Sequence, residues 1–141
     1  MIMSSARKKI LIVDEAGFSR ICSAILEQEG HGTNACSDVR DIDASINFHD
    51  IGLVITSYPY GAVLFEKLKE MKIPTIILSD HLSRDLVTTL EKFGTSLSHC
   101  MIKPLDYTKF RTLVNQVMSG SIKNNNPQYG DNAGSIAPVT V

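Results

Sequence analysis

The chain has 141 residues, with 14 lysines and arginines against 15 aspartates and glutamates and a formal net charge of −1. That length suits one domain with a core of its own. The balanced charge offers no basic surface for nucleic acid or for a lipid headgroup layer. Residues 1–9 carry charge without a following apolar region of signal-peptide length, and the apolar runs are only as long as strands. We therefore expect a soluble, cytoplasmic protein that binds neither nucleic acid nor membranes.

Short apolar runs alternate with segments of helical periodicity along the first third of the chain. Residues 10–13 predict a buried strand, and the apolar positions of 18–26 recur at helical spacing until Gly30 ends the pattern. The apolar side of this helix comprises Phe18, Ile21, Cys22, Ile25 and Leu26. Residues 32–36 predict a more polar strand, which suits a position near a sheet edge. Ser37 or Asp38 is expected to cap a short helix that carries Val39, Ile42 and Ile46 on one side.

The same alternation continues to the end of the predicted domain. Strands are predicted at 53–55, 75–78 and 98–102, and helices at 62–71, at 82–93 and after the capping residue Asp106. Their predicted apolar sides are Leu64, Leu68 and Met71; Leu82, Leu86, Leu90 and Phe93; and Phe110, Leu113, Val114 and Val117. Cys22, Cys36 and Cys100 lack metal-ligand spacing and are expected to be reduced and mostly buried, and the four histidines are expected at the surface.

Alternating strands and helices with short connections predict right-handed crossovers and a doubly wound, five-stranded parallel sheet with helices on both faces. The predicted domain spans 8–118, after a short extension at 1–7. Residues 119–141 are rich in asparagine, glycine and proline and have few large apolar side chains, so we expect a flexible tail there.

Polar residues follow four of the predicted strands, at the sheet edge where ligands of such folds bind. These residues are Asp14, Glu15, Ser57, Ser79 and Lys103. Paired carboxylates hold a hard divalent cation, the cation neutralises a phosphoryl group, and a lysine pairs with the remaining charge. A hydroxyl across the cleft can donate to a phosphate oxygen.

The set resembles the receiver domain of two-component response regulators, over roughly 8–118. The resemblance rests on the acid pair after the first strand, the residue after Leu-Val-Ile-Thr on the third, Ser79 after the fourth and Lys103-Pro104 after the fifth. It implies a flavodoxin-like, five-stranded fold. It also implies an aspartate that a histidine kinase phosphorylates with magnesium, held by the acid pair, a hydroxyl and the lysine.

Four positions depart from the family pattern. Ser57 stands at the acceptor position and cannot form an acyl phosphate, and Gly61 follows after a shorter loop than the family carries. Asp80 stands where a small side chain usually leaves the pocket open, so its charge would repel an incoming phosphate. Cys100 stands at the switch position, where the family tends to carry an aromatic residue.

We therefore expect an atypical, stand-alone receiver domain of phosphorelay signalling that acts by phosphorylation-independent protein–protein interaction and is not an enzyme. Its partner would be a signalling protein or a histidine kinase, and a homodimer stays open. Magnesium binding at Asp14 and Glu15 is expected to be weak or lost, and no other cofactor is expected. The family resemblance points to the fourth helix, fifth strand and fifth helix as the docking face. Candidate residues there are Leu82, Arg84, Val87, Tyr107, Lys109 and Arg111.

Other interpretations remain. The pocket could bind a small anion or ligand, phosphotransfer could have moved to Asp80 or Glu15, or Lys103 could activate Ser57 as a nucleophile, although the acid pair favours the charged lysine. In the plainest interpretation the acid pair only offsets the burial of Lys103, and Ser79 caps the turn that follows it.

Overall fold

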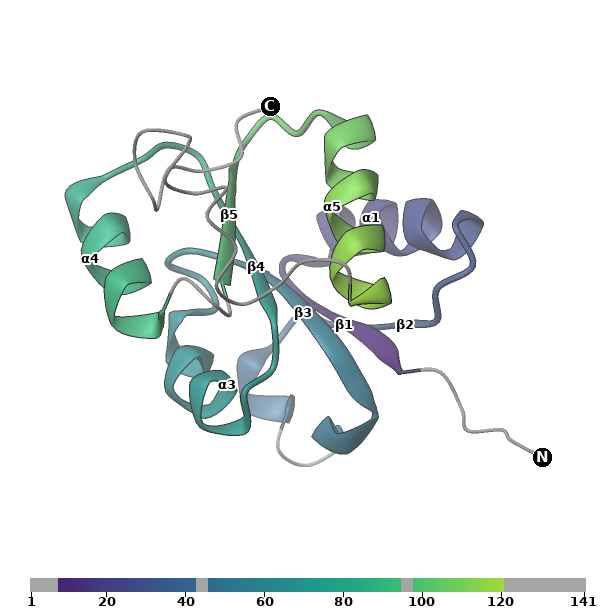
Figure 1. Ribbon diagram of the computed structural model, residues 1–141, viewed down its shortest axis with the longest axis horizontal. Coiled ribbons are helices and arrows are strands. Elements are labelled where there is room, and N and C mark those ends of the chain that lie inside the picture. Colours follow the sequence, from purple (N-terminus) through teal and green to yellow (C-terminus); the bar gives the residue numbers. More distant parts are fainter. Residues whose placement is uncertain (1–7, 43–45, 95–97, 121–141) are drawn as a thin grey trace.

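The computed structural model describes residues 8–42, 46–94 and 98–120. A parallel sheet with strand order β2-β1-β3-β4-β5 forms the centre of the molecule (Figure 1). The strands are β1 (Lys9–Val13), β2 (Thr33–Cys36), β3 (Ile51–Ser57), β4 (Thr75–Ser79) and β5 (Ser98–Ile102). The predicted weaker strand is β2, and it lies at the edge of the sheet as its polar sequence indicated.

Helices cover both faces of this sheet. They are α1 (Ala16–Gln28), α3 (Phe65–Met71), α4 (Arg84–Phe93) and α5 (Tyr107–Ser119). Short 3-10 turns lie at Val39–Asp41 (η1), Phe48–Asp50 (η2) and Ala62–Leu64 (η3). In Figure 1, α1 and α5 lie on one side of the sheet, and α3 and α4 lie on the other. The doubly wound, flavodoxin-like architecture predicted from the alternation is thus confirmed.

The inner strands are apolar on both sides because each side meets a layer of helices. In β1, Leu11 and Val13 join the core that includes α3 and α4, whereas Ile10 and Ile12 join the core that includes α1 and α5. All four side chains are fully buried. This two-sided burial explains why the strands appear in the sequence as continuous apolar runs and not as alternating ones.

Side-chain caps fix several helix starts. Asp38 accepts a hydrogen bond from the Arg40 amide, Ser83 from the Leu86 amide, and Asp106 from the Thr108 and Lys109 amides. The predicted caps at Asp38 and Asp106 are therefore confirmed. The short helix predicted after Asp38 begins as the η1 turn and continues to the buried Ile42, and residues 43–45 lie outside the described part of the chain.

Some predicted core positions are wrong. Ile21 is 51% exposed because α1 rests on the sheet through Cys22 and Leu26. Leu82 is 49% exposed because it precedes the Ser83 cap and so lies outside α4. Met71 is 36% exposed because it ends α3, beyond the last turn that packs on the sheet. Helical spacing identifies a side of a helix, but not how far along it the neighbouring layer extends.

The expectation of surface histidines fails at one position. His99 lies in β5 and is 6% exposed, and its burial lowers the pKa of the imidazole to about 4. The side chain is therefore neutral near pH 7. The cysteines behave as expected, since Cys22 and Cys100 are buried and all three thiols are free.

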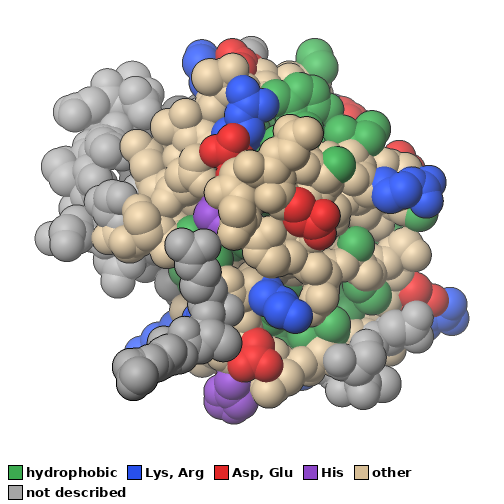
Figure 2. Space-filling model, turned by 90° about the vertical axis from the view of Figure 1, so that its right-hand side faces the viewer, with side chains coloured by type: hydrophobic (Ala, Val, Ile, Leu, Met, Phe, Trp, Pro, Cys, Tyr) green, Lys and Arg blue, Asp and Glu red, His purple; other side chains and the backbone are tan. Residues whose placement is uncertain are grey.

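The last helix extends slightly further than the predicted domain. Ser119, which the sequence assigned to the tail, closes α5, and Gly120 caps it with a φ of 75°. The predicted extension at 1–7 and the rest of the predicted tail, 121–141, lie outside the described residues. None of the helices described between 8 and 120 combines the length and hydrophobicity needed to cross a bilayer. On the face shown in Figure 2, basic and acidic side chains are interspersed.

Candidate functional site

The topology brings the ends of β1, β3 and β5 to one edge of the sheet, and three of the predicted site residues meet there. Asp14 follows β1 and is 4% exposed, Ser57 ends β3 and is buried, and Lys103 follows β5. Parallel pairing of Val13 with Thr56 sets Asp14 beside Ser57. The site therefore follows from the register of the central strands.

Asp14 is the centre of this group. Its Oδ1 accepts hydrogen bonds from the backbone amide of Glu15 at 2.8 Å and from the Ser57 hydroxyl at 3.3 Å. Its Oδ2 is buried, lies 3.8 Å from the Lys103 ammonium and accepts no hydrogen bond from the described residues. Asp14 and Lys103 are thus an ion pair without a direct hydrogen bond.

Lys103 has a second partner that sequence reasoning missed. Its Nζ lies 4.4 Å from the centroid of the Phe18 ring, and about a quarter of its side chain is exposed. An aromatic face and a carboxylate both stabilise an ammonium ion. The helical spacing predicts only that Phe18 lies on the apolar side of the first helix. Its place in the first turn of α1, four residues after Asp14, is the signal that indicates a position near the site.

Cys22, one turn further along α1, lies near the same charges. Burial, together with the negative charge of Asp14 and partly opposed by Lys103, raises the pKa of its thiol to about 12. A thiol in this state carries almost no thiolate near pH 7, so Cys22 adds packing to the site and no nucleophile.

The remaining predicted site residues do not join the Asp14 group. The Ser79 hydroxyl donates to the carbonyl of His81 at 2.8 Å and accepts from the His81 amide at 3.4 Å, so it closes the turn after β4. The plainer interpretation of Ser79 is the one the structure favours. Glu15 and Asp80 are exposed. Cys100, the predicted switch position, is buried in the core on the α3 and α4 side, and burial raises its thiol pKa to about 11.

The loop after Ser57 is held tightly against the strand end. The Gly61 amide donates to the carbonyl of Ser57 at 2.7 Å, and a Cβ at Gly61 would lie 2.0 Å from Thr56 Oγ1. Thr56 Oγ1 in turn donates to the carbonyl of Val13 at 2.7 Å. The Tyr60 hydroxyl donates to the carbonyl of Ser37 and so joins this loop to the segment after β2. The short loop predicted from the position of Gly61 is therefore a compact turn.

The oxygen donors at this edge fit magnesium poorly. Asp14 Oδ2 is a buried carboxylate oxygen without a hydrogen bond, as a metal ligand would be, but the Lys103 ammonium is already beside it. At the acceptor position Ser57 supplies a neutral hydroxyl in place of a carboxylate. Within 8–42, 46–94 and 98–120, no three His, Cys, Asp or Glu side chains gather as a metal site would require. Mg²⁺ needs near-octahedral oxygen ligation, which the described residues at this edge do not provide.

Comparison with known proteins shows the fold. No family model and no curated protein matches the sequence. The chemotaxis protein CheY4 of Vibrio cholerae aligns with a TM-score of 0.67 and 16% identity, over 79% of this chain and 99% of its own. A response regulator receiver protein from Pseudomonas putida aligns with a TM-score of 0.65 and 22% identity, over 80% of this chain and 99% of its own.

A further match is the non-phosphorylated HemR receiver domain from Leptospira biflexa, with a TM-score of 0.68 and 17% identity over 79% of this chain and 94% of its own. The chain is thus structurally similar to CheY-like receiver domains over nearly all of their length. At such low identity the likeness shows a shared fold, and function has to be argued from the site.

Proposed function

We propose that the chain is an atypical receiver domain that transmits a signal by binding a partner protein, without phosphorylation at Ser57. The observation that carries the proposal is the closed arrangement at the acceptor position. Ser57 donates to Asp14 Oδ1, and the Asp14 carboxylate is ion-paired with Lys103, so the three polar groups at this position interact with one another. The receiver fold is retained while the chemistry at its usual site is absent.

The chemistry of Ser57 supports this reading. A serine cannot form the acyl phosphate of an aspartate, and its hydroxyl needs a neighbouring base to act as a nucleophile. Lys103 could be that base only in its neutral form, whereas both the Asp14 carboxylate and the Phe18 ring stabilise its charged form. We therefore propose no hydrolase activity and no other enzymatic role.

The docking face proposed for the partner is the one formed by α4, β5 and α5. Leu82 and Tyr107 are large apolar or aromatic side chains there, and they are 49% and 38% exposed. Tyrosine is enriched among the few residues that carry most of the binding energy at protein interfaces, and an apolar side chain such as Leu82 suits the apolar centre of an interface. Candidate partners are a histidine kinase or another protein of a phosphorelay, in the cytoplasm.

Intact-mass analysis tests the loss of phosphorylation. The protein is incubated with acetyl phosphate and Mg²⁺, and a conventional receiver domain treated in parallel shows that the donor is active. We expect the native protein to stay unmodified and the Ser57→Asp variant, which restores a carboxylate beside Asp14, to gain phosphate. If the Ser57→Asp variant also takes up no phosphate, residues of the site other than Ser57 also prevent phosphorylation. Uptake of a hydroxylamine-labile phosphate by the native protein would overturn the proposal and make Asp80→Asn the next variant.

Cross-linking and affinity purification test the docking face. We expect Leu82→Asp with Tyr107→Asp to abolish capture of the partner. Val63→Asp serves as the matched control, because Val63 is 72% exposed and lies in η3, away from that face. Addition of phosphodonor should leave capture of the partner unchanged. Equal loss in the control variant, or capture that needs phosphodonor, would contradict the proposed mode of action.

A further inference from the structure

A second candidate site lies at the opposite edge of the sheet, where the strands begin. A cavity of about 870 Å³ opens there between the ends of α1 and α5 and the segments before β3 and β4. Cavities that hold small molecules in proteins range from roughly 300 to 1,000 Å³. None of its described lining residues belongs to the Asp14 group, so an inference from it is independent of the proposed receiver function.

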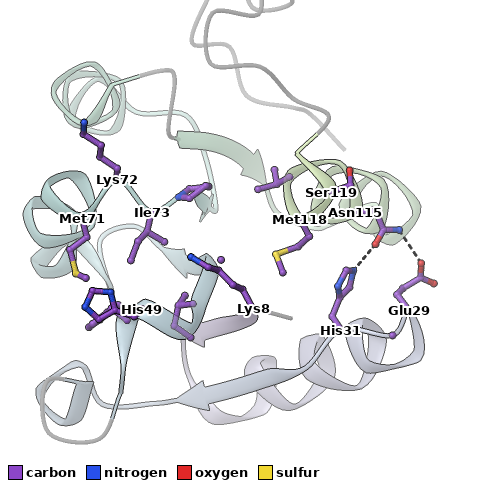
Figure 3. A pocket seen from close by; sticks show the side chains of 16 residues that line it. Lys8, Glu29, His31, His49, Met71, Lys72, Ile73, Asn115, Met118 and Ser119 are labelled. Atoms are coloured by element: carbon purple, nitrogen blue, oxygen red, sulfur yellow. Dashed lines mark hydrogen bonds between the residues drawn. The ribbon is translucent and has the colours of Figure 1, made fainter. Parts of the chain in front are cut away.

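Apolar side chains line part of this cavity. Phe48, Ile51 and Ile73 are each at most 7% exposed, and they line it from the segments that lead into β3 and β4. Met71 and Met118 add flexible thioether side chains, as Figure 3 shows. Methionine adapts its shape to the ligand that it contacts. This surface suits a flat or branched apolar group.

One wall carries a chain of hydrogen bonds. The side-chain amide of Asn115 donates to Glu29 Oε1 at 3.1 Å, and its oxygen is 2.6 Å from His31 Nε2 (Figure 3). An amide oxygen can only accept, so His31 Nε2 is the donor in this pair. The hydrogen bond between His31 and Asn115 therefore holds the His31 ring in one orientation. It joins the segment after α1 to α5, which are far apart in the sequence.

The charges around the cavity are mostly positive. Lys8 and Lys72 line it, together with the imidazoles of His31 and His49. Glu29 is the one acidic side chain among the described lining residues, and it is already bound by Asn115 and lies 4.0 Å from the Arg111 guanidinium. The cationic side chains consequently outnumber the acidic ones, and the acidic one has partners of its own.

We propose that this cavity binds a small carboxylic acid with an apolar body. The apolar group would lie on Phe48, Ile51 and Ile73, and the carboxylate would lie near the ammonium group of Lys8, which points toward the middle of the cavity (Figure 3). An apolar pocket with a few polar groups that fix orientation is the usual design of small-molecule sites. The positive lining selects an anion over a neutral or cationic molecule of the same shape.

Ligand titration followed by NMR tests the proposal on the full chain. The probe is 2-naphthoate, and 2-naphthamide is its neutral counterpart of nearly the same shape. We expect 2-naphthoate to shift the backbone amides of Gly52 and Ile73 and the side-chain amide of Asn115, all of which line the cavity. The neutral amide should bind at least about fivefold more weakly, which corresponds to the loss of one favourable charge interaction.

Charge-reversal variants locate the binding. Lys8→Glu should weaken 2-naphthoate binding at least about fivefold and leave 2-naphthamide binding nearly unchanged. Lys92→Glu makes the same change on an exposed lysine of α4 that does not line the cavity, and it should bind 2-naphthoate like the native protein. A circular dichroism spectrum confirms that each variant is folded.

Three results would overturn the proposal. The first is the absence of shifts at the cavity with millimolar 2-naphthoate, or equal binding of acid and amide. The second is an equal loss of binding in Lys92→Glu. The third is that protein already fills the cavity when no ligand is present. Nuclear Overhauser contacts from residues 1–7 or 121–141 would show that the same chain fills it, and chemical shifts that depend on protein concentration would indicate a second copy.

Discussion

At the carboxyl edge of the sheet the charged side chains of Asp14 and Lys103 are paired with each other, whereas at the amino edge charged side chains surround an open cavity. The Asp14 carboxylate has Lys103 and Ser57 as partners within the fold, and the loop closed by Gly61 packs against the same strand end. Lys8 and Lys72 instead line a space of about 870 Å³.

The difference suggests a proposal, that this chain binds a ligand away from the place where its fold usually binds one. A site binds a charged ligand when its own charged groups lack partners inside the protein. A charged group that is already paired gains little from a ligand, because the ligand would have to replace the existing partner. By that criterion we propose that the carboxyl edge has a structural role and that the amino edge is the better candidate for recognition.

The largest effect is expected from acid, which acts on the buried imidazole of His99. His99 is buried in its neutral form, with its pKa lowered from 6.5 to about 4 by desolvation. Between those two pH values the unfolded chain binds a proton that the folded chain does not, so stability falls as the pH decreases through this window. The contribution of His99 to that loss is roughly 3 kcal/mol.

Urea unfolding between pH 7 and pH 4 measures this loss. The His99→Gln variant removes the titration and should flatten the profile, whereas His81→Gln, at an exposed position, should leave it unchanged. An identical acid dependence in the native protein and in His99→Gln would show that His99 is protonated in the folded state.

Alanine at two glycines compares the packing of the two edges. A Cβ at Gly61 would lie 2.0 Å from Thr56 Oγ1, so Gly61→Ala should cost about 2 kcal/mol of unfolding free energy. At Gly52, by the open cavity, the nearest contacts would be the Lys8 Cβ at 3.0 Å and the flexible end of Met118 at 3.5 Å. Gly52→Ala should therefore change stability by less than about 1 kcal/mol. Thermal or urea unfolding measures both variants, and equal costs would contradict the contrast between a closed and an open edge.

A double-mutant cycle on the carboxyl edge measures the smallest of these effects. Lys103→Met retains contact with Phe18 but leaves the buried Asp14 charge unpaired, and we expect a loss of about 1 to 2 kcal/mol. Asp14→Asn in the same chain should cancel part of that loss, with a coupling energy of about 1 kcal/mol. Additive effects in urea unfolding would show that the 3.8 Å pair contributes nothing to stability.

Much of the fold could be predicted from the sequence, because its cues are local. The buried strand at 75–78 needed only a run of apolar residues, and the start of α5 needed only Asp106 before an apolar periodicity. Alternation of such segments with short connections leaves few topologies open. The errors at Ile21 and Met71 concern exposure, which depends on how far the facing layer reaches.

The candidate site was predictable in its membership but less so in its contacts. The sequence placed Asp14, Ser57 and Lys103 at one edge, and the structure brings those three together. For Ser79 it left two interpretations open, a contact across the site or a cap on the following turn, because a serine at a strand end can bond either way with similar local geometry, and the structure shows the turn.

The sequence by itself determined the order of strands and helices, the caps near Asp38 and at Asp106, and the absence of a carboxylate at position 57, since each of these depends on near neighbours in the chain. Only the tertiary structure decided that Phe18 would cover Lys103, that His99 would be buried, and that a cavity would open at the amino edge. Those features depend on the meeting of distant segments, such as His31 with Asn115, 84 positions apart. Their geometry is set by the packing of whole layers, which no local pattern records.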